Sequence, residues 1–327
     1  MERKGSLEPD KRDMQLLYLL DLDGRMNYSE LAKKTRLSKQ LVKYRIKRLE
    51  DEGFIKGYYA MIDSSRLGFT TFRVYLKFRN LVPEKKKSII SYLTKQKSIW
   101  AVVLLAGKWD IALGVAVKDI YGFYEVWEKI LKDHISFIGE YKISIYSPIY
   151  HYAKSYLVGQ KDVSVIRVLG GREKADFDKK DIRILIELSR SARISLLDLS
   201  EKIKMTPEAI SHRIKQLQKK GIIQGYRAMI DVSKLGYEFY KAEIRLSSYD
   251  QIDKIFDFCY SHPNIYQVDK TIGGETLEVE FHVKSLNEML KIFDELEKVF
   301  PKVIERFDYL TVLSEEKTTY MPEISLT

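Results

Sequence analysis

Apolar residues recur every three to four positions over residues 10–52 and every second position from residue 72 onward. The first spacing is that of one face of a helix, as at Val42, Ile46 and Leu49. It predicts three short helices followed by an extended segment that resembles a short wing. The predicted helices cover residues 10–22, 27–34 and 38–52.

The second spacing is that of a strand with two different faces. Phe72, Val74 and Leu76 share one face, whereas Arg73 and Tyr75 lie on the other. The order of elements that follows, β-α-β-β-α-β, is that of a ferredoxin-like sandwich. After the first strand, the predicted ranges are 83–97, 99–106, 111–117, 119–132 and 138–147.

The same succession of patterns occurs twice in the chain. Shifted by 168 residues, residues 11–69 align with residues 179–237 without a gap, and 22 of these 59 positions are identical. The chain is therefore a tandem duplication. We expect an α+β fold with two copies of a winged helix-turn-helix, each followed by a ferredoxin-like effector and dimerisation module. The expected boundaries are 1–68 and 69–150 for the first unit, 151–178 for a linker with a Gly pair and mixed charges, and 179–236 and 237–327 for the second unit.

The third helix of the first unit is strongly basic. Residues 33–48 carry eight Lys or Arg and no acidic residue. Lysines this dense repel one another on an isolated helix, and phosphates lying against them relieve the repulsion. A solvated surface is the alternative explanation, but the place of this helix after a capped turn favours entry into the DNA major groove. The predicted DNA-binding residues are Lys39, Gln40, Lys43, Tyr44, Arg45 and Lys47.

The third helix of the second unit is less basic. Residues 201–216 carry four basic and two acidic residues, and Glu208 would lie uncomfortably close to phosphate. We expect this helix to bind DNA but to read different bases, rather than to be inactive. Its predicted DNA-binding residues are Ser211, His212, Arg213 and Lys215.

Two related stretches carry a resemblance to a known family. "LSKQLVKYRIKRLEDEGFIKGYYAMIDSSRLG" (37–68) and "MTPEAISHRIKQLQKKGIIQGYRAMIDVSKLG" (205–236) are each followed by a β-α-β-β-α-β pattern. They resemble the Lrp/AsnC, or feast/famine, transcription regulators over nearly the whole chain, twice. The resemblance implies a cytoplasmic regulator that binds double-stranded DNA, forms a homodimer or higher homo-oligomer through its ferredoxin-like modules, and responds to an amino acid or similar small effector.

In this family a Gly-x-x-Asp turn between the middle strands lies near the effector site. Gly107 and Asp110 match it in the first unit, whereas Gly273 and Thr276 stand at the aligned positions of the second. The resemblance therefore implies an effector site at Gly107 and Asp110. Family members usually carry one unit per chain, so this chain would already be a pseudo-dimer.

Charge suggests how the two units meet. The chain has a net charge of +10, which favours a polyanionic partner. Residues 71–150 have a net charge of +6 and residues 239–327 a net charge of −7. Opposite fields favour pairing of unlike modules, either within one chain or between two chains. The stretch "YHYAKSY" (150–156) we interpret as an interface strand rather than a surface for stacking nucleobases.

The sequence gives little support for a disulfide, a metal site or a membrane span. A single cysteine, Cys259, excludes an internal disulfide, and five scattered histidines have no metal-ligand spacing. The longest apolar runs, 99–107 and 111–117, are shorter than the ~18 residues of a membrane span. We therefore expect a cytoplasmic protein with no cofactor, no metal and no membrane partner.

Two alternatives to a sequence-specific regulator stay open. Siroheme decarboxylases share this two-part architecture, and fused forms exist. The stretches here that correspond to their histidine-containing motif, "IWAVVLLAGKWDIALGV" and "IYQVDKTIGGETLEVEF", lack that histidine. A sequence-tolerant architectural DNA-binding protein is the other alternative. It would show little preference for any site and a steep salt dependence.

Overall fold

The computed structural model describes residues 8–159, 166–171, 173–319 and 321–322. Three helices and a strand open the first unit, and the predicted bounds of those helices differ from the observed ones by at most one residue. The elements are α1 (Lys11–Leu22), α2 (Tyr28–Thr35), α3 (Lys39–Asp51), β1 (Ile55–Ile62), η1 (Ser64–Leu67), β2 (Thr70–Phe78), α4 (Pro83–Lys95), β3 (Ile99–Ala106), β4 (Ile111–Val117), α5 (Ile120–His134), η2 (Ile135–Phe137) and β5 (Ile138–His151).

The second unit repeats this order, after a connector that contains η3 (Ser155–Leu157) and β6 (Arg167–Leu169). Its elements are α6 (Lys179–Arg190), α7 (Leu196–Ile203), α8 (Pro207–Lys219), β7 (Ile223–Ile230), η4 (Ser233–Leu235), β8 (Glu238–Leu246), α9 (Ile252–Ser261), β9 (Ile265–Ile272), β10 (Leu277–Val283), α10 (Leu286–Val299) and β11 (Ile304–Thr318). Among the described helices, none is long and apolar enough to span a bilayer.

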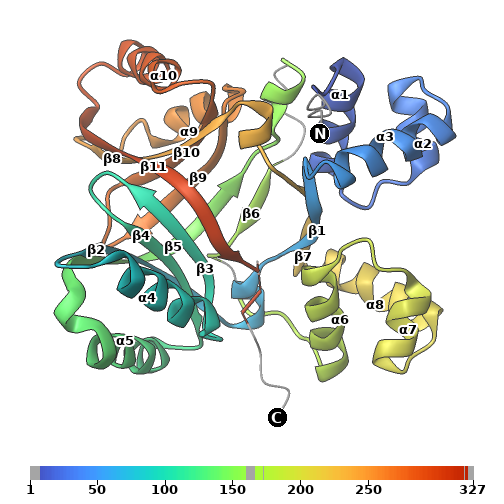
Figure 1. Ribbon diagram of the computed structural model, residues 1–327, viewed down its shortest axis with the longest axis horizontal. Coiled ribbons are helices and arrows are strands. Elements are labelled where there is room, and N and C mark those ends of the chain that lie inside the picture. Colours follow the sequence, from blue (N-terminus) through green and yellow to red (C-terminus); the bar gives the residue numbers. More distant parts are fainter. Residues whose placement is uncertain (1–7, 160–165, 172, 320, 323–327) are drawn as a thin grey trace, which may run out of the picture.

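The two ferredoxin-like modules of one chain form a closed barrel (Figure 1). Its eight strands follow the order β2-β4-β3-β11-β8-β10-β9-β5, and β5 also pairs with β2 to complete the ring. The last strand of each module makes the closure possible. The first part of β11 pairs with β8 of its own module and its last part with β3 of the other. Similarly, β5 pairs first with β2 and then with β9.

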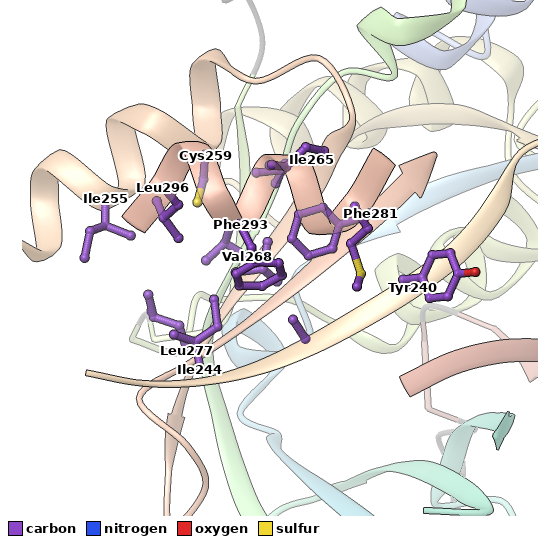
Figure 2. Close-up of a cluster of buried hydrophobic side chains, with 14 of the residues drawn as sticks. Tyr240, Ile244, Ile255, Cys259, Ile265, Val268, Leu277, Phe281, Phe293 and Leu296 are labelled. Atoms are coloured by element: carbon purple, nitrogen blue, oxygen red, sulfur yellow. The ribbon is translucent and has the colours of Figure 1, made fainter. Parts of the chain in front are cut away.

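Each module has its own apolar core between its sheet and its two helices. In the first module, Phe72, Val74 and Leu76 pack in that core, as their alternation predicted. Figure 2 shows the corresponding core of the second module, where Phe281 from β10 packs with Phe293 from α10 and Cys259 from α9. The helices of both modules thus cover the outside of the barrel, and the opposite faces of the two sheets enclose its interior.

The charge of the two modules is matched across the barrel. Lys142 Nζ lies 2.6 Å from an oxygen of Glu243, and Lys108 Nζ lies 3.3 Å from an oxygen of Asp308. The indole of Trp109 also donates to Glu243, at 3.2 Å. Cations and donors of the first module therefore contact carboxylates of the second. The predicted pairing of unlike modules is confirmed, in its intrachain form.

Each three-helix bundle forms a separate head on the same side of the barrel (Figure 1). The segment expected to be a wing does not fold back on its own head. Instead, β1 pairs antiparallel with β7 of the other unit, from Ile55 opposite Ile230 to Ile62 opposite Ile223. Gly57 and Gly225 have φ angles of 156° and 152°, and the first lies at a shift in the register of the ribbon. This two-stranded ribbon joins the heads.

The connector is packed, where the sequence predicted a linker. Its described part includes β6, which pairs with the end of β5, and a buried stretch that covers residues 151–157. Tyr152 joins the core of the second module, and Tyr156 packs in the core of the first head. The aromatic residues of "YHYAKSY" therefore lie at an interface, as we interpreted them, because they join a head to the barrel.

A buried ion network fixes the first head to the ribbon and the connector. Asp21 of α1 is fully buried and accepts hydrogen bonds from Arg227 Nε at 2.8 Å and Arg227 Nη2 at 2.6 Å. It also accepts from the backbone N–H of Lys154 at 3.0 Å and from Lys154 Nζ at 3.1 Å. Burial alone would raise the pKa of Asp21, but the charges of Arg227 and Lys154 outweigh burial and hold this pKa well below 3.8.

Replacing Asp21 with Asn should lower the free energy of unfolding by about 3–5 kcal/mol at neutral pH, because Arg227 and Lys154 would lose the buried carboxylate that they share. Since the folded pKa of Asp21 is depressed, its contribution is complete above the unfolded pKa and is lost as the pH falls through the folded pKa. Urea unfolding at pH 7 measures the first effect, and unfolding at pH values from about 5 down to about 2 follows the second. The exposed Asp51→Asn variant is the control, and equal stability of the two variants would contradict this role.

Candidate nucleic-acid interface

The turn before α3 sets the orientation of this helix. Arg36 ends α2 in the left-handed conformation, with a φ of 55°, and Lys204 does the same for α7 with a φ of 62°. Ser38 then caps α3 by accepting from the backbone N–H of Leu41 at 3.1 Å, and Thr206 caps α8 by accepting from Ala209 at 3.3 Å. Both heads therefore have the tight turn of a helix-turn-helix.

The basic face of α3 points to solvent. Val42, Ile46 and Leu49 are fully buried in the head. Five of the six predicted DNA-binding residues of this helix are exposed, and the Tyr44 side chain has 62% of its surface accessible. These five are Lys39, Gln40, Lys43, Tyr44 and Lys47. None of the ion pairs among the described residues includes Lys39, Lys43 or Lys47, so these cations can approach phosphate without breaking one.

Arg45 is the exception on α3, because its guanidinium is engaged inside the head. Its Nη1 lies 2.7 Å from an oxygen of Asp10 and 2.9 Å from an oxygen of Asp13, and Asp13 also binds Arg48 at 2.8 Å. These ion pairs hold α3 against the start of α1. The structure gives Arg45 a contact that positions the recognition helix, and its contact with DNA stays a prediction.

Arg213 repeats this arrangement in the second head. Its Nη1 lies 2.8 Å from oxygens of both Asp178 and Asp181, and the hydrogen bonds to Asp181 and Asp178 raise its pKa above the usual value of an arginine. The two aspartates form a capping box at the start of α6, as Asp10 and Asp13 do at the start of α1. The sequence carried a signal for this pairing, because all three positions recur at the repeat offset of 168 residues.

The face of α8 is more mixed. His212 and Lys215 are exposed, and Ser211 is half-buried. Glu208 is exposed in the first turn, where α3 has Gln40. The two recognition helices thus present the same fold with different side chains, which is the basis for reading unlike bases.

The Gly-x-x-Asp turn of the first module is occupied by contacts within the module. Asp110 accepts from the backbone N–H of Phe78 at 2.8 Å and from Lys77 Nζ at 3.2 Å, and Lys77 also donates to the carbonyl of Gly107 at 3.1 Å. In the second module the Thr276 hydroxyl accepts from the backbone N–H of Leu246 at 3.1 Å. Asp110 and Thr276 therefore play the same structural role. An effector at Gly107 and Asp110 stays a prediction.

Sequence comparisons identify relatives of each unit. A model of winged helix-turn-helix DNA-binding domains matches residues 9–56 and 177–224. An HTH-type transcriptional regulator of Pyrococcus furiosus is 41% identical over 121 residues, which cover 35% of this chain and 77% of that protein. The HTH-type transcriptional regulator LrpC of Bacillus subtilis is 32% identical over 110 residues, covering 31% of this chain and 76% of that protein.

A solved structure matches both units at once. The siroheme decarboxylase NirDL superposes with a TM-score of 0.65, covering 97% of this chain and 95% of that chain, at 12% sequence identity. At this identity the similarity shows the fold alone. Two heads attached to one barrel are thus an arrangement that another single chain also adopts.

Replacing Arg45 with Gln should lower the free energy of unfolding by about 1–3 kcal/mol, because Asp13 would keep a buried carboxylate with fewer partners. Lys43→Gln should leave stability unchanged but weaken DNA binding more than Arg45→Gln does. Urea unfolding and binding to a fluorescent duplex separate the two roles. A large loss of DNA affinity in Arg45→Gln without a loss of stability would show that Arg45 contacts DNA directly.

Proposed function

Because this chain belongs to the Lrp/AsnC family of HTH-type transcriptional regulators, we propose that it is a sequence-specific DNA-binding regulator whose single chain supplies both halves of the DNA-binding unit. One observation carries the proposal. Two capped helix-turn-helix heads lie on the same side of one barrel and are joined by the β1–β7 ribbon (Figure 1). In this arrangement α3 and α8 enter successive major grooves, about 34 Å or a multiple of it apart.

The DNA site should have unlike halves. Lys39, Lys43 and Lys47 supply charge to neutralise phosphates, and Gln40 and Tyr44 contact base edges or the backbone. On α8 the corresponding contacts come from Ser211, His212 and Lys215. Arg45 and Arg213 orient the helices, and each contacts DNA only if its ion pairs with the aspartates break. A true palindrome would present the same bases to two different helices.

The intrachain barrel affects how chains would assemble and how an effector would act. The ferredoxin-like sheets that pair between chains in a one-unit regulator pair here within one chain. A homodimer or higher homo-oligomer would therefore form through surfaces outside the barrel interior. A small effector that changes the angle between barrel and heads would modulate DNA binding. A regulator of this kind acts in the cytoplasm, where it meets the prokaryotic chromosome.

We do not propose an enzyme. The relatives that are 30–41% identical in sequence to this chain, over most of their own length, are transcriptional regulators. The decarboxylase shares the fold of this chain, at 12% sequence identity. An architectural role differs from regulation only in sequence preference, which a binding experiment measures.

Replacing Lys43 and Tyr44 together with Ala should weaken binding to one half of the DNA site by about tenfold or more and leave the other half nearly unchanged. Replacing His212 and Lys215 with Ala should have the opposite preference. Selection of a random-sequence duplex library on each variant, followed by sequencing, reads both halves. Loss of both halves together in either variant would contradict the assignment of one head to each half, and no enrichment by the unaltered chain would favour the architectural role.

Anaerobic incubation with siroheme should leave the mass of siroheme unchanged, because residues 99–115 and 265–281, which correspond to the decarboxylase motif, contain no histidine. Mass spectrometry of the extracted tetrapyrrole is the measurement. Loss of carboxyl groups in proportion to the protein added, and not with heat-denatured protein, would show that the chain is an enzyme.

A further inference from the structure

The barrel encloses a cavity of about 630 Å³ that no role described above uses. Volumes of roughly 300–1,000 Å³ are typical of sites for small organic molecules. Most of its wall is apolar, with Ala101, Val103, Leu105 and Ala112 on the side of the first module and Phe239 on the side of the second. The cavity is therefore large enough for a small molecule and suits one with an apolar body.

The cavity exists because the inner faces of the two sheets differ in size. On β4 the inward positions Ala112 and Gly114 are small, and at Gly114 an added Cβ would lie 2.8 Å from the ring of Trp100, which itself lines the cavity. On β8 and β10 the inward positions carry long side chains, such as Lys241 and Glu280. Small residues facing long ones leave a space beside the Trp100 indole.

One buried cation in the cavity wall has no counter-ion in direct contact. Arg73 is 7% exposed, lines the cavity and places its guanidinium 4.4 Å from the centre of the Tyr146 ring. Its Nε has no hydrogen-bond partner among the described residues, and none of their ion pairs includes Arg73. A buried hydrogen-bond donor without a partner costs free energy, which an acceptor on a ligand can recover.

Three acids close to Arg73 are engaged by Lys241. Lys241 Nζ lies 3.1 Å from an oxygen of Asp269, 2.8 Å from an oxygen of Glu278 and 2.9 Å from an oxygen of Glu280. Tyr75 also donates to Glu278, at 2.7 Å. These carboxylates stabilise the charge of Arg73 from a distance, but their closest contacts are with other donors.

We infer that the barrel interior binds a small monocarboxylate with an apolar body, and that Arg73 is its anchor. A guanidinium presents two parallel N–H groups that match the two oxygens of a carboxylate, and the bond is strongest where water is excluded. The apolar wall opposite, from Ala101 to Ala112, then covers the body of the ligand. A neutral or cationic molecule of the same shape would leave the guanidinium without a partner.

The position of the cavity links it to the heads. Its lining includes Ser64, Ser65 and Gly68, just after β1, and Gly170 and Lys174, just before the second head. A ligand in the cavity therefore touches both segments that lead from the barrel to the heads. Binding of the carboxylate is independent of the role in transcription, whereas any effect of it on DNA rests on the proposed function.

Titration of the full chain without DNA tests the inference, with tryptophan fluorescence and calorimetry as readouts. The probes are phenylacetate, 3-phenylpropionate, 4-methylpentanoate and octanoate, each compared with its amide, and phenethylamine as the cationic counterpart of phenylacetate. At least one acid should bind at one site per chain, at least tenfold more tightly than its amide. No binding by any acid, or equal binding of acid and amide, or tighter binding of the amine, would overturn the inference.

Variants locate the site. Arg73→Gln should weaken binding of the acid at least tenfold, and Arg73→Lys should weaken it less, because a lysine keeps the charge but loses the paired N–H groups. Arg79→Gln, at an exposed arginine just after the same strand, is the control. Ala112→Leu fills the cavity without changing charge and should also abolish binding, which keeps the test valid if Arg73→Gln does not fold. Full binding in Ala112→Leu would place the ligand outside the barrel.

Discussion

The pairing of β5 and β11 with strands of both modules is the constraint on which the rest of this structure depends. Each of these strands completes its own sheet with its first part and reaches the opposite sheet with its last part. Each of the eight barrel strands thereby pairs with a neighbour on both sides, so the barrel has no open edge. The directions of the two chain segments that leave the barrel, and with them the positions of the two heads, follow from this closure.

Duplication in one chain has allowed the two modules to become unlike. Two identical modules must carry the same net charge, so opposite net charges are possible only when the modules differ. Here Lys142 from one module meets Glu243 from the other at 2.6 Å, and such contacts specify which surfaces pair. The same freedom extends to the heads, since α3 and α8 share a fold but not their exposed residues. A regulator assembled from identical chains would not have this freedom.

The buried network around Asp21 transmits the geometry of the barrel to the first head. Asp21 belongs to the head, Lys154 to the connector and Arg227 to β7 of the other unit. Each member needs the others, because an unpaired charge at this depth is costly. The head is therefore held in one orientation relative to the ribbon. The cavity borders two other segments that lead to the heads, residues 64–68 and 170–174, which is why we regard its occupancy as relevant to DNA binding.

Local pattern was sufficient to predict the elements of the fold. The helices of the heads and the β-α-β-β-α-β order follow from spacing, and the duplication follows from identity along the chain. The exposed face of α3 followed from the same periodicity, since Val42, Ile46 and Leu49 are buried together.

Contacts between distant parts of the chain could not be predicted from local sequence pattern. Arg73 and Tyr75 occupy the polar face of a strand, and only the pairing of the two modules buries that face. The extended segment after α3 has the composition of a wing, but its partner strand is more than 150 residues away in the sequence. Arg45 looked like a DNA contact because it lies on a basic helix, and its aspartate partners are on α1. The role of Asp110 in effector binding is still a prediction, and its observed contacts are structural.

A DNA-cleavage probe attached to each head would test most directly whether one head reads each half of the site. The single native cysteine, Cys259, is buried, so Gln40→Cys or Glu208→Cys provides one reactive position at equivalent places on α3 and α8. With an iron chelate at that cysteine, cleavage of a bound bipartite duplex should occur at one half from Gln40→Cys and at the other half from Glu208→Cys. Equal cleavage of both halves by either probe would show that the heads are interchangeable and would contradict the division of labour between them.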